Sequence, residues 1–174
     1  MFSSPEQNIE KVHIDPGMKI ADLGSGAGFY SIAAAKLAGP SGRVYAVDVQ
    51  KDLLEKLKQE SLSEGLSNIE LVWGDLDEPN GTKLADDLVE RIIIANVLFQ
   101  VEDKDALITE AKRILKSKGK ILFVDWSDSY NGLGPQLSDI IRPDVAQTLF
   151  ESHGFEFEKE IQVGDHHYGL IFKL

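Results

Sequence analysis

The sequence predicts an α/β fold in which a five-stranded parallel sheet is completed by an antiparallel pair of strands. Five short apolar runs alternate with segments of helical spacing, and several runs are apolar at consecutive positions, as in strands buried on both faces. The runs span residues 18–23, 44–49, 69–73, 88–95 and 121–126. Two further strands are expected over residues 155–161 and 167–173. Because the chain between them is far shorter than the dozen residues that a parallel connection needs, these two strands must be antiparallel.

Helices are expected between these strands, each with a recognisable start or end. Gly39-Pro40 ends one helix, Asp103 can cap a second that runs on towards Gly119, and Pro143 can open a third. The expected helices cover about residues 5–13, 29–38, 51–63, 104–118 and 143–153. Alternating strands and helices of this kind are typical of a doubly wound α/β sheet.

The length and composition are those of one domain. The chain has 174 residues, 43% of them hydrophobic, without a repeat or a linker-like tract, so we expect a single domain over residues 1–174. The chain has no run of about eighteen apolar residues, the length that a membrane-spanning helix needs, and we see no apolar signal segment before the first strand. We therefore expect a cytoplasmic protein. The absence of cysteine excludes disulfides and thiolate metal sites.

The charge balance argues against nucleic acid as a partner. The chain carries 29 acidic and 18 basic residues, a net charge of -11 at pH 7. Proteins that bind nucleic acid nonspecifically do so by neutralising phosphates with basic groups. One basic cluster, Lys112, Arg113, Lys116 and Lys118, lies at the predicted end of a helix. These cations are either a phosphate-binding patch or a favourable complement to the helix dipole.

A glycine-rich loop is the strongest local signal. Residues 20–30 read Ile-Ala-Asp-Leu-Gly-Ser-Gly-Ala-Gly-Phe-Tyr, a strand that runs through alternating glycines into a helix. Glycines let the backbone turn sharply and approach a ligand closely. The dinucleotide pattern G-x-G-x-x-G fails, because its third glycine would be Phe29. The loop instead reads G-x-G-x-G preceded by Asp22, whose carboxylate could pair with an ammonium group. A plain structural turn is the alternative.

Polar residues follow the predicted strands at one edge of the sheet. Asp48 ends the second strand, twenty residues beyond Gly28, where a carboxylate can accept hydrogen bonds from two ribose hydroxyls. Asp75 follows the third strand and Asn96 the fourth. Each alone could be an ordinary loop residue. Together with Asp22 they predict a ligand site at the carboxyl edge of the sheet.

These motifs resemble the class I S-adenosylmethionine-dependent methyltransferases over essentially the whole chain. The resemblance is carried by Asp15-Pro-Gly-Met-Lys-Ile-Ala-Asp-Leu-Gly-Ser-Gly, Gly42-Arg-Val-Tyr-Ala-Val-Asp, Asn68-Ile-Glu-Leu-Val-Trp-Gly-Asp and Leu115-Lys-Ser-Lys-Gly-Lys-Ile-Leu-Phe-Val-Asp-Trp. It implies a Rossmann-like seven-stranded sheet of order 3-2-1-4-5-7-6, with strand 7 antiparallel and helices on both faces. It also implies S-adenosyl-L-methionine as cofactor and S-adenosyl-L-homocysteine as product.

The resemblance assigns a role to each residue of the predicted cofactor site. Asp48 would bind the ribose hydroxyls, Val49 would lie against the adenine, and Asn96 would lie beside the methionine moiety, facing the acceptor. The residues implied for the methionine end are Asp22, Leu23, Gly24, Ser25, Gly26 and Gly28, and those near the adenine edge are Asp75 and Leu76.

The sequence favours a small-molecule acceptor. The most similar branch of the family includes ubiquinone and menaquinone C-methyltransferases. The short helix at about 5–13 stands where such enzymes often build a fuller lid, and Asn96-Val-Leu-Phe lacks the paired prolines of nucleobase amino-methyltransferases. The alternatives are a methyltransferase that modifies RNA or protein with a partner subunit, and a binding module without turnover. The oligomeric state is not predicted.

His166, His167 and Asp125 are the candidates for acid–base chemistry. The two histidines lie where the antiparallel hairpin enters its second strand, and a neutral imidazole there could take a proton from the acceptor. Asp125 precedes a loop that could receive substrate. A purely structural role is the alternative for all three. No metal site is expected, because such a site needs further ligands at matching spacing and His13 and His153 offer no such cluster.

Overall fold

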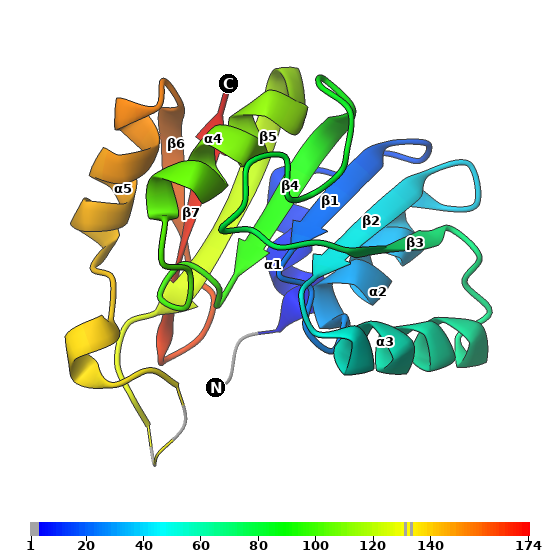
Figure 1. Cartoon of the computed structure of the whole chain (residues 1–174), viewed down its shortest axis with the longest axis horizontal. Coiled ribbons are helices and arrows are strands. Elements are labelled where there is room, and N and C mark those ends of the chain that lie inside the picture. Colours follow the sequence, from blue (N-terminus) through cyan, green and yellow to red (C-terminus); the bar gives the residue numbers. More distant parts are fainter. Residues whose placement is uncertain (1–3, 131, 133) are drawn as a thin grey trace.

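The computed structural model describes residues 4–130, 132 and 134–174, which form one mixed sheet flanked by helices (Figure 1). The helices are α1 (Pro5–Ile9), η1 (Glu10–Val12), α2 (Phe29–Ala38), α3 (Lys51–Ser63), α4 (Lys104–Ile114), η2 (Leu137–Asp139) and α5 (Pro143–Ser152). The strands are β1 (Lys19–Leu23), β2 (Arg43–Asp48), β3 (Ile69–Trp73), β4 (Val89–Ala95), β5 (Leu115–Trp126), β6 (Glu156–Ile161) and β7 (His167–Lys173). None of the described helices is long and apolar enough to cross a membrane.

The seven strands are ordered β3-β2-β1-β4-β5-β7-β6. The first five are parallel, and β7 lies antiparallel between β5 and β6. The predicted order and the antiparallel pair are confirmed. The chain winds outward from β1 to β3 and then returns to place β4 on the other side of β1. The connections that follow β1 and β4 therefore diverge, which opens a crevice at the carboxyl ends of the strands.

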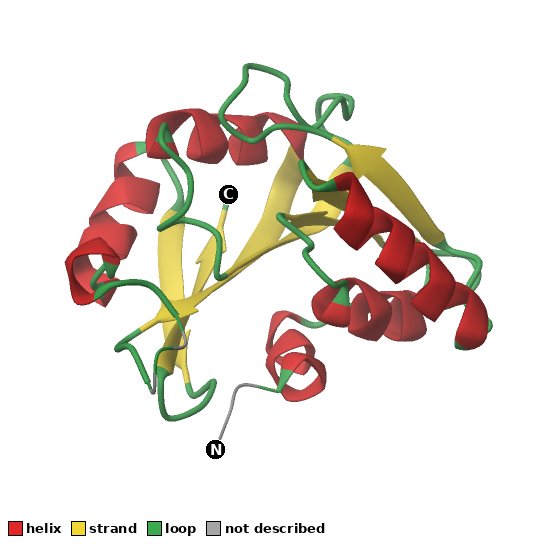
Figure 2. Ribbon diagram, turned by 60° about the horizontal axis from the view of Figure 1, so that its bottom comes forward, coloured by secondary structure: helices red, strands yellow, loops and turns green. Residues whose placement is uncertain are grey.

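Both faces of the sheet are covered, which explains why its strands are apolar at consecutive positions. In β4, Ile92 and Ile94 pack into the hydrophobic cluster beneath α4 and α5, whereas Ile93 packs into the cluster beneath α1 and α2. All three side chains are fully buried. Figure 2 shows the corresponding two groups of helices on opposite sides of the sheet.

The junction of α4 and β5 differs from the predicted helix that runs on towards Gly119. The helix ends at Ile114, and Leu115 already pairs with Val89 of β4. Leu115 is fully buried. The helical spacing of the apolar residues is therefore overridden where strand pairing and burial begin, as tertiary context often overrides local propensity.

Three of the four residues of the basic cluster near this junction make side-chain contacts within the chain. Arg113 pairs with Glu110 at 2.8 Å, and Lys116, which lies on the strand rather than on the helix, pairs with Glu90. Lys112 donates a hydrogen bond of 2.7 Å to a backbone carbonyl just beyond α5. These contacts favour a structural role for the cluster over a phosphate-binding one.

The first helical segment is tied to the sheet and to α2. The predicted helix at about 5–13 is seen as α1 followed by the 3-10 turn η1. Ile9 and Val12 are fully buried. The Arg91 guanidinium donates a hydrogen bond of 2.7 Å to the Val12 carbonyl, and the Asn8 amide donates one of 2.9 Å to the Tyr30 hydroxyl. This segment thereby forms part of the wall beside the crevice.

Candidate functional site

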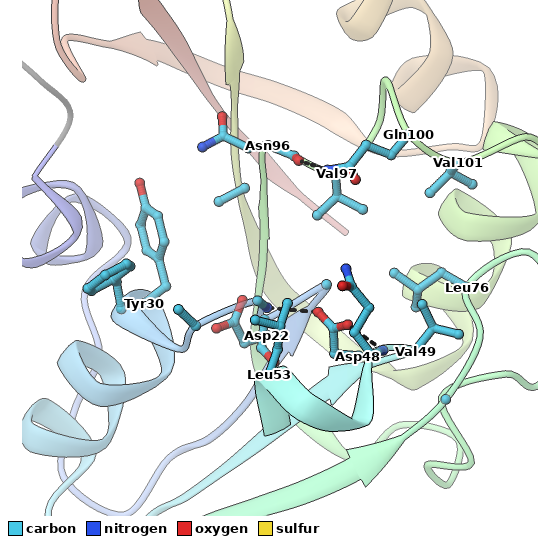
Figure 3. Close-up of a pocket in the computed structure, with 18 of the residues that line it drawn as sticks. Asp22, Tyr30, Asp48, Val49, Leu53, Leu76, Asn96, Val97, Gln100 and Val101 are labelled. Carbon is cyan, nitrogen blue, oxygen red and sulfur yellow. Dashed lines mark hydrogen bonds between the residues drawn. The ribbon is translucent and has the colours of Figure 1, made fainter. Parts of the chain in front are cut away.

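A cavity of about 730 Å³ opens at the carboxyl ends of β1, β2 and β4, where the strand order reverses (Figure 3). It is walled by the loop after β1, the end of β2 and the first residues after β3 and β4. Its volume lies within the range of about 300–1,000 Å³ that is usual for small-molecule sites. The location agrees with the edge of the sheet predicted from the polar strand ends.

The three glycines of the loop after β1 have positive φ angles but serve different purposes. A Cβ on Gly24 would lie 2.4 Å from Val97, and a Cβ on Gly28 would lie 2.2 Å from Leu57, so these two positions allow close packing within the chain. A Cβ on Gly26 would meet no atom within 4 Å. Gly24 and Gly26 line the cavity, whereas Gly28 does not. Only Gly26 therefore combines the turn with open space for a ligand.

Asp48 joins this loop to the end of β2. Its Oδ2 accepts a hydrogen bond of 2.8 Å from the Gly26 N–H, and its Oδ1 accepts one of 2.8 Å from the Gln50 N–H. The side chain lines the cavity and is 7% exposed. A carboxylate offers about four lone-pair positions, so two remain for ligand hydroxyls.

Asp22 lies at the floor of the cavity with one strong hydrogen bond. The Ser31 hydroxyl donates to its Oδ2 at 2.6 Å. Burial raises the pKa of Asp22 to about 7, a rise that the Ser31 hydroxyl opposes and the nearby Asp48 carboxylate assists. A cationic partner would stabilise the ionised form of this buried carboxyl and so lower its pKa. Leu23, the next residue, is fully buried in the core and does not line the cavity.

The other side of the cavity is more apolar. Val49, Asp75 and Leu76 all line it, and Val49 is 53% exposed. The Trp73 indole N–H donates a hydrogen bond of 3.0 Å to the Val49 carbonyl, which holds this residue at the end of β2. The Asp77 N–H donates to Asp75 Oδ1 at 3.0 Å. An apolar surface with a carboxylate at its margin suits a heteroaromatic ring.

Asn96 and His167 lie at the far end of the cavity, together with Trp126. Asn96 has a φ of 59°, its N–H donates to the Val124 carbonyl at 2.8 Å, and its own carbonyl accepts from Gln100 at 2.7 Å. The imidazole of His167 and the indole of Trp126 have centroids 4.2 Å apart. Asn96 and His167, both predicted from the sequence, therefore line the cavity together with the indole ring of Trp126.

The other two candidates for acid–base chemistry lie outside the cavity lining. His166 Nδ1 is 2.8 Å from Asp128 Oδ1, and its ring stacks on Tyr130 with centroids 4.2 Å apart. Asp125 is 1% exposed, and its Oδ1 accepts a hydrogen bond of 2.8 Å from the Trp126 N–H. Burial raises the pKa of Asp125 to about 7. The structure thus separates the predicted trio and leaves His167 alone at the cavity.

Several lining residues were not found from the sequence. They include Tyr30, Gln50, Leu53, Gln100 and Val101. Tyr30 had a usable signal, because it lies in the first turn of the helix that follows the glycine loop. The first turn of such a helix faces the same crevice as the loop. Gln100 and Val101 carried no pattern that marks them as lining residues.

Comparison with known proteins identifies the family. The family model described as "Methyltransferase domain" matches residues 14–160. The chain belongs to the class I S-adenosylmethionine-dependent methyltransferases. It is 31% identical over 127 residues, 73% of its length, to the ubiquinone/menaquinone biosynthesis C-methyltransferase of Bordetella avium, and 27% identical over 122 residues to the demethylmenaquinone methyltransferase of a Geobacillus species. The first match covers 48% of that relative and the second 51%.

The chain therefore spans about half the length of the curated relatives that it matches. Among solved structures, a methyltransferase from Aquifex aeolicus superposes with a TM-score of 0.89 over 99% of this chain and 90% of that one, at 24% identity. At this identity the likeness shows the methyltransferase fold alone. The named relatives also agree with the branch of the family that the motifs indicate.

The cavity of this methyltransferase fits the cofactor of its family. Gly26 leaves open the space that a side chain would fill, and the Ser25 hydroxyl is a buried polar atom without a hydrogen-bond partner among the described residues. Both line the cavity beside Asp22 and Asp48. Within the described ranges no group of three or more His, Asp or Glu side chains is arranged to hold a metal ion.

Proposed function

We propose that this chain transfers the methyl group of S-adenosylmethionine to a small-molecule acceptor. The observation that carries the proposal is the continuity of the cavity, which runs from Asp48 and the glycine loop to Asn96, Trp126 and His167. Cofactor and acceptor can therefore lie side by side. The Bordetella relative is named a C-methyltransferase of ubiquinone and menaquinone biosynthesis, which supports an acceptor of small molecular size.

In the half of the cavity beside β1 and β2, different residues suit the ribose, the methionine end and the adenine of the cofactor. Asp48 would accept hydrogen bonds from the two ribose hydroxyls, since its lone pairs are only partly used by Gly26 and Gln50. Asp22 and the backbone of the loop would hold the methionine end, with the carboxylate facing the ammonium group. Val49 would lie against the adenine, whose edge faces Asp75 and Leu76.

The other half of the cavity would hold the acceptor. Bound S-adenosylmethionine supplies a methyl group on a sulfonium that is already a good leaving group. The chain has therefore to align the acceptor with that methyl, exclude water and accept a proton where the nucleophile carries one. We assign the role of proton acceptor to His167, because it lines the cavity and because burial and the nearby His166 lower its pKa, which favours the neutral imidazole.

The decisive experiment measures S-adenosylhomocysteine after incubation of the chain with S-adenosylmethionine and three separate acceptor pools. The pools are a small-molecule metabolite extract, bulk RNA and a protein extract. We expect product with the small-molecule pool alone, and less product from the Asp48→Ala variant when S-adenosylmethionine is below saturation. A His167→Gln variant should form product more slowly with unchanged affinity for S-adenosylhomocysteine.

The alternatives make different predictions for the same assay. Product formed only with RNA or protein would replace the small-molecule acceptor by a macromolecule. Binding of S-adenosylmethionine by calorimetry without product in any pool would show a binding module without turnover. Equal rates for the wild type and His167→Gln would remove His167 from the chemistry.

A further inference from the structure

The connection between β3 and β4 walls the side of the cavity where the proposed function puts the adenine. Residues 74–88 form this connection without a helix or a strand. A segment of this length without secondary structure is uncommon in a compact domain and is usually either functional or disordered. Its first four residues line the cavity, namely Gly74, Asp75, Leu76 and Asp77. The contacts that hold the segment in place therefore also hold part of the cavity wall.

The segment folds back on itself at Gly81. A Cβ on Gly81 would clash with the Asp75 carbonyl oxygen, and a Cβ on Gly74 would clash with the Gly81 carbonyl oxygen. The Gly81 N–H donates a hydrogen bond of 2.9 Å to the Glu78 carbonyl, which closes the turn. The backbone of Gly81 therefore packs directly against the backbone of two residues that line the cavity.

The next residue, Thr82, is anchored to α4 by a buried carboxylate. Thr82 is fully buried, and Glu110 of α4 is 5% exposed. The Thr82 N–H donates a hydrogen bond of 3.2 Å to Glu110 Oε1, and the Thr82 hydroxyl donates to the same oxygen. Hydrogen bonds to an ionised acceptor are about twice as strong as those between neutral groups. Glu110 thereby fixes both the backbone and the side chain of Thr82.

Glu110 is itself held by Arg113, one turn further along α4. The guanidinium donates from Nε to Oε2 and from one terminal nitrogen to Oε1, each at 2.8 Å, and a bidentate pair of this kind has a defined geometry. The same guanidinium pairs with Asp86 of the connection. Burial raises the pKa of Glu110, but the hydrogen bonds from Arg113 and Thr82 outweigh burial and hold it below its usual value. The anchor is therefore an ionised carboxylate with a fixed orientation.

Neither Glu110 nor Thr82 is among the residues that line the cavity. Their effect on a ligand must pass through the chain, from Glu110 to Thr82, and from the adjacent Gly81 to Asp75. The Asp75 carboxylate accepts one hydrogen bond of 3.0 Å from the Asp77 N–H at its Oδ1. Since a carboxylate has about four lone-pair positions, Asp75 can accept a further hydrogen bond from a ligand.

We propose that Glu110 is a positioning residue for the cofactor, which acts through Thr82 to hold Asp75 where its carboxylate accepts a hydrogen bond from the adenine amino group. This inference rests on the proposed function, in which the adenine edge faces Asp75 and Leu76. The amino group of adenine donates hydrogen bonds, whereas an oxopurine carries at the same position a carbonyl oxygen that only accepts. The anchor at Glu110 therefore sets the preference of the site for adenine.

The test compares S-adenosylhomocysteine with S-inosylhomocysteine, in which a carbonyl oxygen replaces the amino group of the base. Thr82→Val keeps the shape of the side chain and removes the hydroxyl, Thr82→Ser keeps the hydroxyl, and Glu110→Ala removes the anchor. Isothermal titration calorimetry measures both dissociation constants for the wild type and each variant. The wild type and Thr82→Ser should prefer S-adenosylhomocysteine by at least about tenfold, and Thr82→Val and Glu110→Ala should lose most of this preference.

The ratio of the two dissociation constants separates positioning from stability. A merely structural role of Glu110 would lower the free energy of unfolding and weaken both ligands alike, which leaves the ratio unchanged. Lys112→Gln is the matched control, because it removes a contact of α4 with the backbone just beyond α5, and it should keep the wild-type ratio. Thr82→Val decides the question if Glu110→Ala does not fold. A wild-type ratio in Thr82→Val would overturn the inference.

The two proposals fail in different ways. A wild-type chain that binds neither ligand would overturn the proposed function and this inference together. Normal binding of S-adenosylhomocysteine, combined with equal affinity of the wild type for S-inosylhomocysteine, would overturn the inference alone.

Discussion

Asp48 has two tasks at once in this site. Its carboxylate accepts hydrogen bonds from the backbone of Gly26 and Gln50, and it lines the cavity where the ribose would lie. The first contact shapes the glycine loop, and the second position would let the carboxylate bind the ligand that we propose. Substitutions that keep one task and remove the other can separate them.

S-adenosylhomocysteine should bind the wild type in a one-to-one ratio, and Asp48→Ala should weaken that binding by roughly 1.5–3 kcal/mol, the usual cost of losing hydrogen bonds to a charged group. Asp48→Asn keeps one acceptor oxygen and should lose less. Isothermal titration calorimetry measures all three affinities. An Asp48→Ala variant with wild-type affinity would remove the carboxylate from the site.

Asp22 and Asp125 are two buried carboxyls with raised pKa values, of which only Asp22 lines the cavity. Burial raises both pKa values from 3.8 to about 7. A carboxyl whose pKa is higher in the folded chain than in the unfolded chain binds its proton more tightly when folded. Its contribution to stability therefore falls as the pH rises from about 4 to about 7. The same ionisation makes Asp22 a better partner for an ammonium group.

The affinity for S-adenosylhomocysteine should therefore rise between about pH 5.5 and pH 8, by less than about tenfold per pH unit, because its ammonium group stabilises ionised Asp22. Calorimetry across this range measures the effect. Asp22→Asn should flatten the profile, whereas Asp125→Asn, which changes a carboxyl away from the cavity, should preserve it. A profile that Asp125→Asn flattens and Asp22→Asn does not would reverse the assignment.

At the scale of elements, the loop between β1 and α2 combines internal packing with ligand approach. Gly28 begins α2 with a φ of 85° and faces Leu57 of α3, whereas Gly26 faces open space. Both glycines have a left-handed backbone conformation. A side chain at Gly28 would clash with Leu57, whereas a side chain at Gly26 would enter the open space that we assign to the ligand.

Gly26→Val should abolish cofactor binding and leave a folded chain, because the side chain occupies the ligand's space and adds only local backbone strain of about 1–2 kcal/mol. Gly28→Ala should instead lower the free energy of unfolding by about 2–4 kcal/mol, since strain adds to the clash with Leu57. Urea denaturation and calorimetry on both variants separate the effects. Normal cofactor binding by Gly26→Val would show that the loop is only a connection.

At the scale of the whole molecule, negative charge dominates and the described cations are largely engaged within the chain. The net charge is -11. The cluster near the α4–β5 junction is occupied by contacts such as Arg113 with Glu110 and Lys116 with Glu90. A surface of this kind offers few cations to displace the counterions of a nucleic acid.

The isolated chain should therefore not retain RNA or DNA in filter binding at about 150 mM salt, where specific binders usually reach dissociation constants of about 10⁻⁸ M or lower. A basic RNA-binding protein in the same assay provides the positive control. Submicromolar retention of an RNA would contradict the small-molecule acceptor and favour a macromolecular one.

Much of the fold and of the cofactor half of the cavity was predictable because its signals are local. The apolar runs, the glycine loop and the polar residues that end each strand are contiguous in sequence, and parallel strands bring their carboxyl ends to one edge. The sequence alone thus places Asp22, Asp48, Asp75 and Asn96 together. The length of the hairpin connection also determined that the last two strands are antiparallel.

Only the tertiary structure decided which of the candidate acid–base residues line the cavity. Successive side chains of a strand point to opposite faces, so Trp126 and His167, paired across β5 and β7, line the cavity, while the neighbouring pair Asp125 and Tyr168 is buried on the other face. His166, one residue before β7, turns instead to Asp128. Sequence determines that these groups lie near one edge, but the face that each presents depends on strand register and on the chain packed above it.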